Sequence, residues 1–254
     1  MCTVLMLLRP EHSWPLVVAA NRDERFDRAF DAPGRWWDDA PEIVAGRDVL
    51  GGGSWFGVND DGVVATIVNG LHRLGPLDGK ESRGEIVLRA LRERDAASAA
   101  RFAGALAPSR YRGFTLLLAD RRGAFAVTSD ERSVRVDLLS PGHHMITPEG
   151  CDVTSSPRYT AHFAAFRDAP PPEPAMGDWT AWTDVLSRAD DDDPHRSMTV
   201  AGGAELGTVC STLLALPASA QAPPVMRFAN GPPTRAPYES VAAPWVHGAN
   251  VEGR

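Results

Sequence analysis

The chain has 254 residues, of which 43% are hydrophobic, and its formal net charge is −7. This composition supports a substantial core, and the negative charge excludes the basic footprint of a nucleic-acid-binding protein. No apolar stretch reaches the roughly 18–20 residues of a membrane-spanning helix and no signal-peptide pattern is visible, so we expect a cytoplasmic protein.

The three cysteines, Cys2, Cys151 and Cys210, are odd in number and far apart. They match neither a disulfide framework nor a zinc site. The adjacent His143 and His144 would point to opposite faces of a strand, which is poor geometry for binding one metal ion. We therefore predict no metal and no cofactor.

Two apolar runs, residues 2–8 and 16–20, predict a β-hairpin whose strands are covered on both faces. The first run begins at Cys2, whose small side chain makes removal of Met1 the expected processing step. Removal would place a thiol nucleophile beside a free α-amine, which has a reference pKa of about 7.7–8.0. The alternative is that Cys2 is a buried, inert residue of an edge strand.

Four polar residues, Asn21-Arg22-Asp23-Glu24, follow the second apolar run, where we expect the buried strand to end. Functional residues often take such a position, although an ordinary solvated loop explains the pattern equally well. Residues 25–42 show no clear period. They contain Trp36 and Trp37, which either lie in a loop over a cleft or are plain packing residues.

The glycine-rich segment 51–59 lacks the Lys-Ser/Thr of a phosphate-binding loop and does not open onto a helix. The following Asp60-Asp61-Gly62 predicts a turn into a strand over residues 63–68. That strand ends at Asn69, which either begins a turn or donates a side-chain N–H to an oxyanion.

The rest of the chain reads as blocks of helices and strands. Ser82 and Glu85 have the spacing of a capping box, and Asp95 is the expected cap of an alanine-rich helix. Strand blocks separated by helix blocks predict layered sheets covered by helices. We expect strands at 113–119, 124–127, 133–139, 143–147, 207–215 and 225–228 and helices at 158–166 and 179–186. We also expect a single domain over residues 1–230, followed by an irregular tail over residues 231–254.

Several motifs, taken in order, resemble those of the NRDE family, whose animal members form the transport and Golgi organisation 2 (TANGO2) group. Order and spacing agree over roughly the first 95 residues, and a late strand motif extends the similarity over most of the chain. The motifs are Met1-Cys2, Asn21-Arg22-Asp23-Glu24, Gly52 to Val58, the strand ending at Asn69, Ser82-Arg83-Gly84-Glu85, and Gly207 to Thr212.

The NRDE family itself resembles N-terminal nucleophile (Ntn) hydrolases of the choloylglycine hydrolase and penicillin V acylase kind. This resemblance implies an α+β fold, a four-layer αββα sandwich of two mainly antiparallel sheets. It also implies that Cys2 attacks an amide or ester carbonyl with its own α-amine as base and that Asp23 orients the nucleophile. Asn21 or Arg22 would hold the site together, and Asn69 would be the candidate oxyanion donor.

The sequence departs from the acylase pattern at several positions. The acylases have an arginine just before the asparagine of this motif, where this chain has Ala20. The second half of their site uses another asparagine and an arginine, and Ser155, Ser156 and Arg158 lie in the corresponding region. The late strand carries Val209 where some relatives have arginine.

Two main functions are compatible with these features. The first is an Ntn-type hydrolase or acyltransferase acting on an amide, ester or thioester bond of a small molecule. Trp36, Trp37, Trp55 and Phe56 would then suit an apolar acyl group, unless they belong to the core. The second is a non-enzymatic protein that binds or transports haem or a lipid or acyl compound, although no C-x-x-C-H haem motif is present. A hydrolase fold used only as a scaffold is a third possibility, and the oligomeric state is open.

Overall fold

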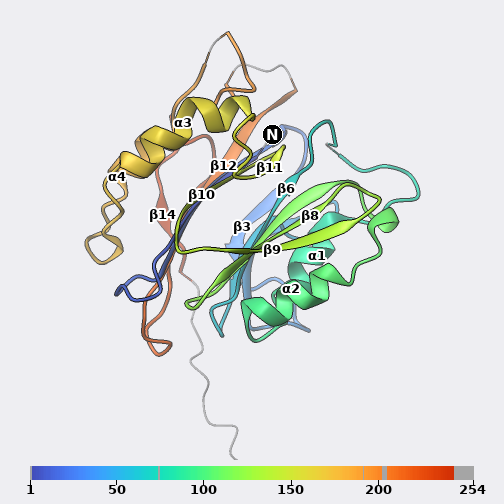
Figure 1. Ribbon diagram of the computed structural model, residues 1–254, viewed down its shortest axis with the longest axis horizontal. Coiled ribbons are helices and arrows are strands. Elements are labelled where there is room, and N and C mark those ends of the chain that lie inside the picture. The colour runs from blue at the N-terminus through green and yellow to red at the C-terminus, as the bar shows by residue number, and fades with distance from the viewer. Residues whose placement is uncertain (1, 74, 191, 202–204, 243–254) are drawn as a thin grey trace, which may run out of the picture.

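The computed structural model describes residues 2–73, 75–190, 192–201 and 205–242 (Figure 1). The strands in these ranges form two seven-stranded sheets in which all neighbouring strands are antiparallel. The first sheet has the order β11 (Gly150–Cys151), β10 (Gly142–Thr147), β1 (Thr3–Leu8), β2 (Leu16–Arg25), β12 (Leu206–Leu216), β13 (Val225–Ala229) and β14 (Glu239–Ser240). The second has the order β3 (Phe30–Gly34), β4 (Ile43–Asp48), β5 (Phe56–Asn59), β6 (Val64–Asn69), β7 (Phe114–Ala119), β8 (Ala124–Ser129) and β9 (Val134–Leu139).

Helices cover the outer face of each sheet, which gives four layers (Figure 1). Helices α1 (Arg83–Ala90) and α2 (Ala96–Gly104) pack on the second sheet, while α3 (Pro157–Asp168) and α4 (Thr180–Leu186) pack on the first. A third hydrophobic cluster fills the space between the sheets. The predicted αββα sandwich is therefore confirmed, and none of the described helices is both long and apolar enough to cross a bilayer. The cytoplasmic location stays a prediction.

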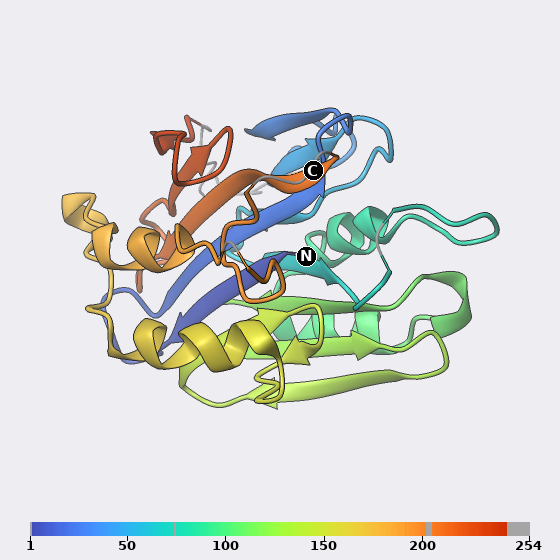
Figure 2. The same cartoon turned by 90° about the horizontal axis from the view of Figure 1, so that it is seen from above.

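The first hairpin forms as predicted, with Leu8 of β1 opposite Leu16 of β2. The predicted end of the second strand at Ala20 is wrong, because β2 continues to Arg25. Its extension pairs with the long strand β12, which lies along β2 in Figure 2. The backbone of the Asn21-Arg22-Asp23-Glu24 segment is therefore part of the sheet, and the four side chains are buried. The interpretation as a solvated loop is excluded.

The segment without a clear period, residues 25–42, contains the strand β3 at the edge of the second sheet. Pro33 is compatible with an edge strand because only one side of such a strand must supply hydrogen-bond donors. Because of this proline and the register shift between β3 and β4, the segment does not show the regular alternation of apolar and polar residues that identifies a strand.

The two predicted helix starts differ in their caps. Asp95 accepts a hydrogen bond from the backbone N–H of Ser98 at 2.7 Å, as expected of an N-cap. Ser82 occupies the N-cap position of α1, but its side chain makes no capping hydrogen bond, so the predicted capping box does not form. Its hydroxyl instead borders the cavity described below.

The segment from residue 231, which we expected to be irregular, contributes the short strand β14 to the first sheet. The last part of the predicted tail, residues 243–254, lies outside the described residues. The division into a domain over residues 1–230 and a tail stays a prediction.

His143 and His144 face opposite sides of β10, as predicted. His143 packs edge-on against Phe166 of α3. His144 has both ring nitrogens in hydrogen bonds, Nδ1 with Asp152 Oδ2 at 2.6 Å and Nε2 with the carbonyl oxygen of Ser140 at 2.8 Å. Burial opposes the charged imidazolium, but these two acceptors outweigh it and raise the pKa of His144.

We predict that the Asp152→Asn substitution destabilises the protein mainly at low pH. A raised folded pKa means that the interaction contributes fully below the unfolded pKa of about 6.5 and is lost as pH rises through the folded value. Since the pair is partly exposed, we expect a loss of about 1 kcal/mol in the free energy of unfolding at pH 5.5 and a smaller loss at pH 8.5. Urea unfolding at both pH values measures this difference, and an equal loss at both would contradict the assignment.

Candidate active site

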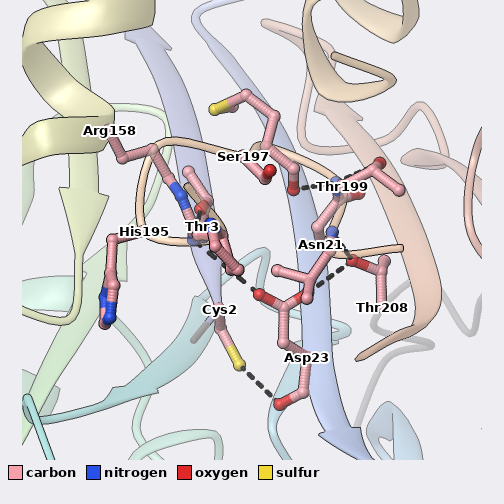
Figure 3. Close-up of polar contacts among 12 residues, drawn as sticks. Cys2, Thr3, Asn21, Asp23, Arg158, His195, Ser197, Thr199 and Thr208 are labelled. Atoms are coloured by element: carbon pink, nitrogen blue, oxygen red, sulfur yellow. Dashed lines mark hydrogen bonds and ion pairs between the residues drawn. The ribbon is translucent and has the colours of Figure 1, made fainter. Parts of the chain in front are cut away.

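Cys2 lies just before β1, and its side chain is in the hydrophobic cluster between the two sheets. The thiol donates a hydrogen bond to the carbonyl oxygen of Asp23 on the neighbouring strand at 3.6 Å (Figure 3). Only 9% of the residue is exposed, and this burial raises the pKa of the thiol. Cys2 also lines a cavity of about 450 Å³ that opens between the second sheet and the start of α1.

Residues of β2 alternate between the two faces of the first sheet. Arg22 faces the second sheet, where its guanidinium lies 4.1 Å from the ring centre of Trp55 and 3.7 Å from Glu24. Asn21 and Asp23 face the opposite side, toward α3 and the segment that follows α4. The motif therefore contributes two residues, Arg22 and Glu24, to the cavity containing Cys2, and two, Asn21 and Asp23, to the buried layer behind it.

The Asp23 carboxylate is contacted by side chains from two other elements (Figure 3). Thr208 of β12 donates to its Oδ1 at 2.6 Å, and Arg158 of α3 places Nη1 at 3.8 Å from its Oδ2. The same guanidinium donates to Thr3 Oγ1 at 2.6 Å. Burial lowers the pKa of Arg158, and the Asp23 charge counteracts this effect. A positive charge is thus held beside the carboxylate in a dry environment.

Asn21 connects the first sheet to distant parts of the chain. Its Nδ2 donates to the carbonyl oxygens of Leu186 at 3.0 Å and Met198 at 2.8 Å. Its Oδ1 accepts from Ser211 at 2.7 Å, and Ser211 also shares a hydrogen bond with the Tyr238 hydroxyl at 2.7 Å. These contacts fit the expectation that Asn21 holds the site together, although its role in function stays a prediction.

The other candidate residues are divided between the cavity and the core. Asn69, at the end of β6, and Trp55 line the cavity together with Cys2. Phe56 does not line it, because the residue is 1% exposed and packed between the sheets. Trp36 and Trp37 are not among its lining residues: Trp36 packs under the Arg47 guanidinium, and Trp37 donates to the carbonyl oxygen of Gly52 at 3.1 Å. Of the four aromatic candidates, the structure brings only Trp55 to Cys2.

Of the candidates for the second half of the site, Arg158 reaches Asp23 as described. Ser155 is exposed, and Ser156 caps α3 while donating to Glu149. Val209 lies at the irregularity in the pairing of β12 with β2. Ala20, at the position of the acylase arginine, is an apolar residue of the cluster between the sheets.

Two groups of residues at the site are missing from the sequence-based candidates. The first is Thr208, which belongs to the late strand motif but was not singled out within it. The second is a set of basic side chains around the cavity, among them Arg83 of the Ser82-Arg83-Gly84-Glu85 motif. Thr208 and Arg83 both belong to motifs that carry the family resemblance, and this was the signal in the sequence that could have identified them. The remaining basic residues at the cavity, Arg28, Lys80 and Arg112, carried no signal.

One group of possible metal ligands lies outside this site. The ligand atoms of His144, Cys151 and Asp152 lie within 4.8 Å of one another. Both nitrogens of His144 are already engaged in hydrogen bonds, and burial raises the pKa of the Cys151 thiol. A metal ion here would have to displace the hydrogen bonds of His144 and take the proton of a buried thiol.

Comparisons with known proteins agree with this architecture. The model of the family described as Transport and Golgi organisation 2 (TANGO2) matches residues 1–168. Among solved structures, the chain is similar to a Caenorhabditis elegans ortholog of N-acylethanolamine-hydrolyzing acid amidase, with 11% identity, a TM-score of 0.53 and coverage of 84% of this chain and 92% of that chain. A search of curated proteins gave no match.

Two further solved structures share the fold. Penicillin V acylase from Agrobacterium tumefaciens has 13% identity and a TM-score of 0.52, over 90% of this chain and 83% of that one. A conjugated bile acid hydrolase from Clostridium perfringens has 10% identity and a TM-score of 0.52, over the full length of both chains. At such low identity the likeness shows the fold, which is that of the Ntn hydrolases.

We predict that Thr208→Val destabilises the fold while Thr208→Ser does not. The Thr208 hydroxyl donates to Asp23 and accepts from the backbone N–H of Val200 at 2.9 Å. Valine has a similar shape but leaves a buried carboxylate oxygen without this donor, so the free energy of unfolding should fall by about 2 kcal/mol. Urea unfolding of both variants checks this, and a valine variant as stable as the serine variant would contradict the role assigned to Thr208.

Proposed function

This chain belongs to the transport and Golgi organisation 2 family, and we propose that it is an N-terminal cysteine hydrolase or acyltransferase acting on an amide, ester or thioester bond of a small molecule. One observation carries the proposal. The Cys2 thiol lines a cavity of about 450 Å³, and the strand beside it fixes a buried carboxylate, Asp23, with its own cationic and hydroxyl partners.

The thiol needs a neighbouring base because its burial raises its pKa. Removal of the residue before Cys2 would expose an α-amine, with a reference pKa of about 7.7–8.0, on the same residue. Thr3 pairs with Asn21, so continuing this register places Cys2 opposite Arg22 and leads its backbone nitrogen toward Asp23. The Asp23 carboxylate is then suited to orient the amine and to stabilise the ammonium that forms.

The proposed reaction has two halves. The amine takes the thiol proton as the sulfur attacks the substrate carbonyl carbon, which forms a tetrahedral intermediate with an anionic oxygen. The intermediate collapses to a thioester on Cys2 as the ammonium returns the proton to the leaving amine, alcohol or thiol. Water activated by the same amine then hydrolyses the thioester, or an acceptor nucleophile takes the acyl group in its place.

Asn69 is the proposed donor to the anionic oxygen. It stands at the end of β6 and lines the same cavity as Cys2, so its side chain borders the space that a substrate would occupy. Donors fixed on a strand end before the reaction are effective because they need no reorganisation as charge develops.

The names of the similar structures favour an amide bond among the three bond types. They are an acid amidase that hydrolyses N-acylethanolamines, a penicillin V acylase and a conjugated bile acid hydrolase. The alternative of non-enzymatic binding of haem or an acyl compound would use the same cavity, and the experiments below separate it from hydrolysis.

We predict that the purified protein has lost the residue before Cys2 and that iodoacetamide at neutral pH labels Cys2 before the other cysteines. Burial raises the pKa of all three thiols, to about 12 for Cys210, but Cys210 and Cys151 have no α-amine of their own to take the thiol proton, so they should react slowly. Intact-mass measurement before and after labelling, with peptide mapping, gives both answers.

Cys2→Ala should abolish the fast labelling phase, while the control Cys210→Ala should keep it. A retained preceding residue would leave Cys2 with a peptide nitrogen in place of an amine. That result would remove the proposed mechanism and make binding the leading function.

We predict that Asp23→Asn lowers the rate of Cys2 labelling by iodoacetamide by about 100-fold, within the usual range for losing the support of a general base. Arg22→Lys, which keeps a positive charge on the cavity side of β2, should change the rate far less. Rates are followed by mass at neutral pH, with circular dichroism to verify folding. An unchanged rate in a folded Asp23→Asn variant would show that the carboxylate does not act on the nucleophile.

A further inference from the structure

The cavity determines where a substrate of Cys2 must lie. Behind Cys2, between the sheets, a second cavity of about 10 Å³ leaves no space for an acyl chain. In front of it, the larger cavity begins with the apolar surfaces of Trp55 and Ile67 and extends toward the start of α1. A molecule whose carbonyl reaches the sulfur therefore finds space for the rest of its structure in the larger cavity.

The walls of this cavity carry an excess of positive charge, although the chain as a whole has a net charge of −7. Five basic and three acidic residues line it. The basic residues are Arg22, Arg28, Lys80, Arg83 and Arg112, and the acidic residues are Glu24, Asp48 and Glu81.

Most of these charges have partners of opposite sign. Arg28 forms an ion pair with Asp48 at 2.6 Å, Arg22 lies 3.7 Å from Glu24, and Lys80 lies 3.1 Å from Glu131 outside the cavity. Arg83 differs, because no carboxylate in the described part of the chain lies within 4 Å of its guanidinium. A cation at the cavity wall is thus left for a ligand.

Arg83 is held in place by backbone oxygens. Its Nη1 donates to Gly113 at 3.0 Å and its Nη2 to Gly75 at 3.4 Å. Arg112 donates to the same Gly75 oxygen at 3.2 Å, so two guanidinium groups converge on one carbonyl. Burial, followed by the repulsion of Arg112, lowers the pKa of Arg83 to about 10. An anion between the two groups would remove this repulsion.

Two further features place the pair within reach of the reaction. Arg83 is the first residue of α1, and the Ser82 hydroxyl before it makes no capping bond, so the positive end of the helix faces the cavity. The electrostatic interaction of Arg83 with the Cys2 sulfur raises the pKa of Arg83, which counteracts the effect of burial. Cys2, Arg83 and Arg112 thus line one cavity.

We infer that the molecule attacked by Cys2 carries an anionic group, a carboxylate or a phosphate, and that Arg83 and Arg112 bind this group. Two converging guanidinium groups match the planar or tetrahedral oxygens of such anions with several charge-assisted hydrogen bonds. The inference rests on the proposed function and narrows its substrates to acidic acyl compounds.

Iodoacetate and iodoacetamide test the inference without a known substrate, because they differ in one negative charge. The measured quantity is the ratio of their labelling rates at Cys2, followed by mass at fixed ionic strength. We expect the ratio to fall about tenfold in Arg83→Gln and in Arg112→Gln, as for the loss of one charge-assisted hydrogen bond. Arg83→Lys should keep most of the ratio. Arg101→Gln, which removes an exposed charge on α2 away from the cavity, should leave it unchanged.

A second measurement does not require a reactive thiol. The melting temperature of the full chain is compared in inorganic phosphate, hexanoate and sodium chloride at equal ionic strength. We expect phosphate or hexanoate to raise it in the wild type and in Arg101→Gln but not in Arg83→Gln. A rise with only one of the two anions identifies which group binds.

The outcomes separate the inference from the proposed function. A rate ratio that is unchanged in both cavity variants, or that falls equally in Arg101→Gln, overturns the anion site, as does the absence of any anion-dependent rise in melting temperature. If iodoacetamide fails to label Cys2 while an anion still stabilises only proteins that keep Arg83, then the nucleophile is wrong and the anion site is supported.

Discussion

The ion pair between Asp23 and Arg158 is the interaction on which the arrangement around Cys2 depends. Its two charges are almost fully buried, at 1% exposure each, and removing one partner from such a pair typically costs about 3–5 kcal/mol because the other charge is left uncompensated. Hydroxyls of Thr3 and Thr208 complete the shell. These contacts therefore require one relative arrangement of strands β1, β2 and β12 and helix α3. This requirement fixes the position of β1 and of Cys2 just before it.

The alternation of side chains along β2 gives the motif two different tasks. Arg22 projects into the space between the sheets and covers Trp55, so it belongs to the cavity wall. Asn21 and Asp23 project into the opposite layer, where their partners are backbone carbonyls and buried side chains. Adjacent residues of a short motif thus act on opposite faces of a sheet, so a single substitution there disturbs either the cavity or its support.

The sequence was sufficient for the layers, the first hairpin and the strand beside the cysteine, because those features follow from apolar periodicity and from motifs close together in the chain. It was insufficient for the end of β2, because buried polar residues there look like a loop until β12 is placed alongside them. The same limit applies to Arg83 and Arg112, which meet at the Gly75 carbonyl only in three dimensions. Phe56 belongs to the Gly52 to Val58 motif but packs in the core, and the sequence left both positions open for it.

The hydrogen bonds that join Asn21 to Ser211 and Ser211 to Tyr238 connect positions 190 and 27 residues apart in the chain. During synthesis on a ribosome, the hairpin bearing Cys2 emerges first, whereas these partners emerge near the end of the described chain. The nascent protein therefore carries an incomplete site through most of its translation. The surroundings of Cys2 are complete only when β12 inserts beside β2, so the site is assembled at a late step of synthesis.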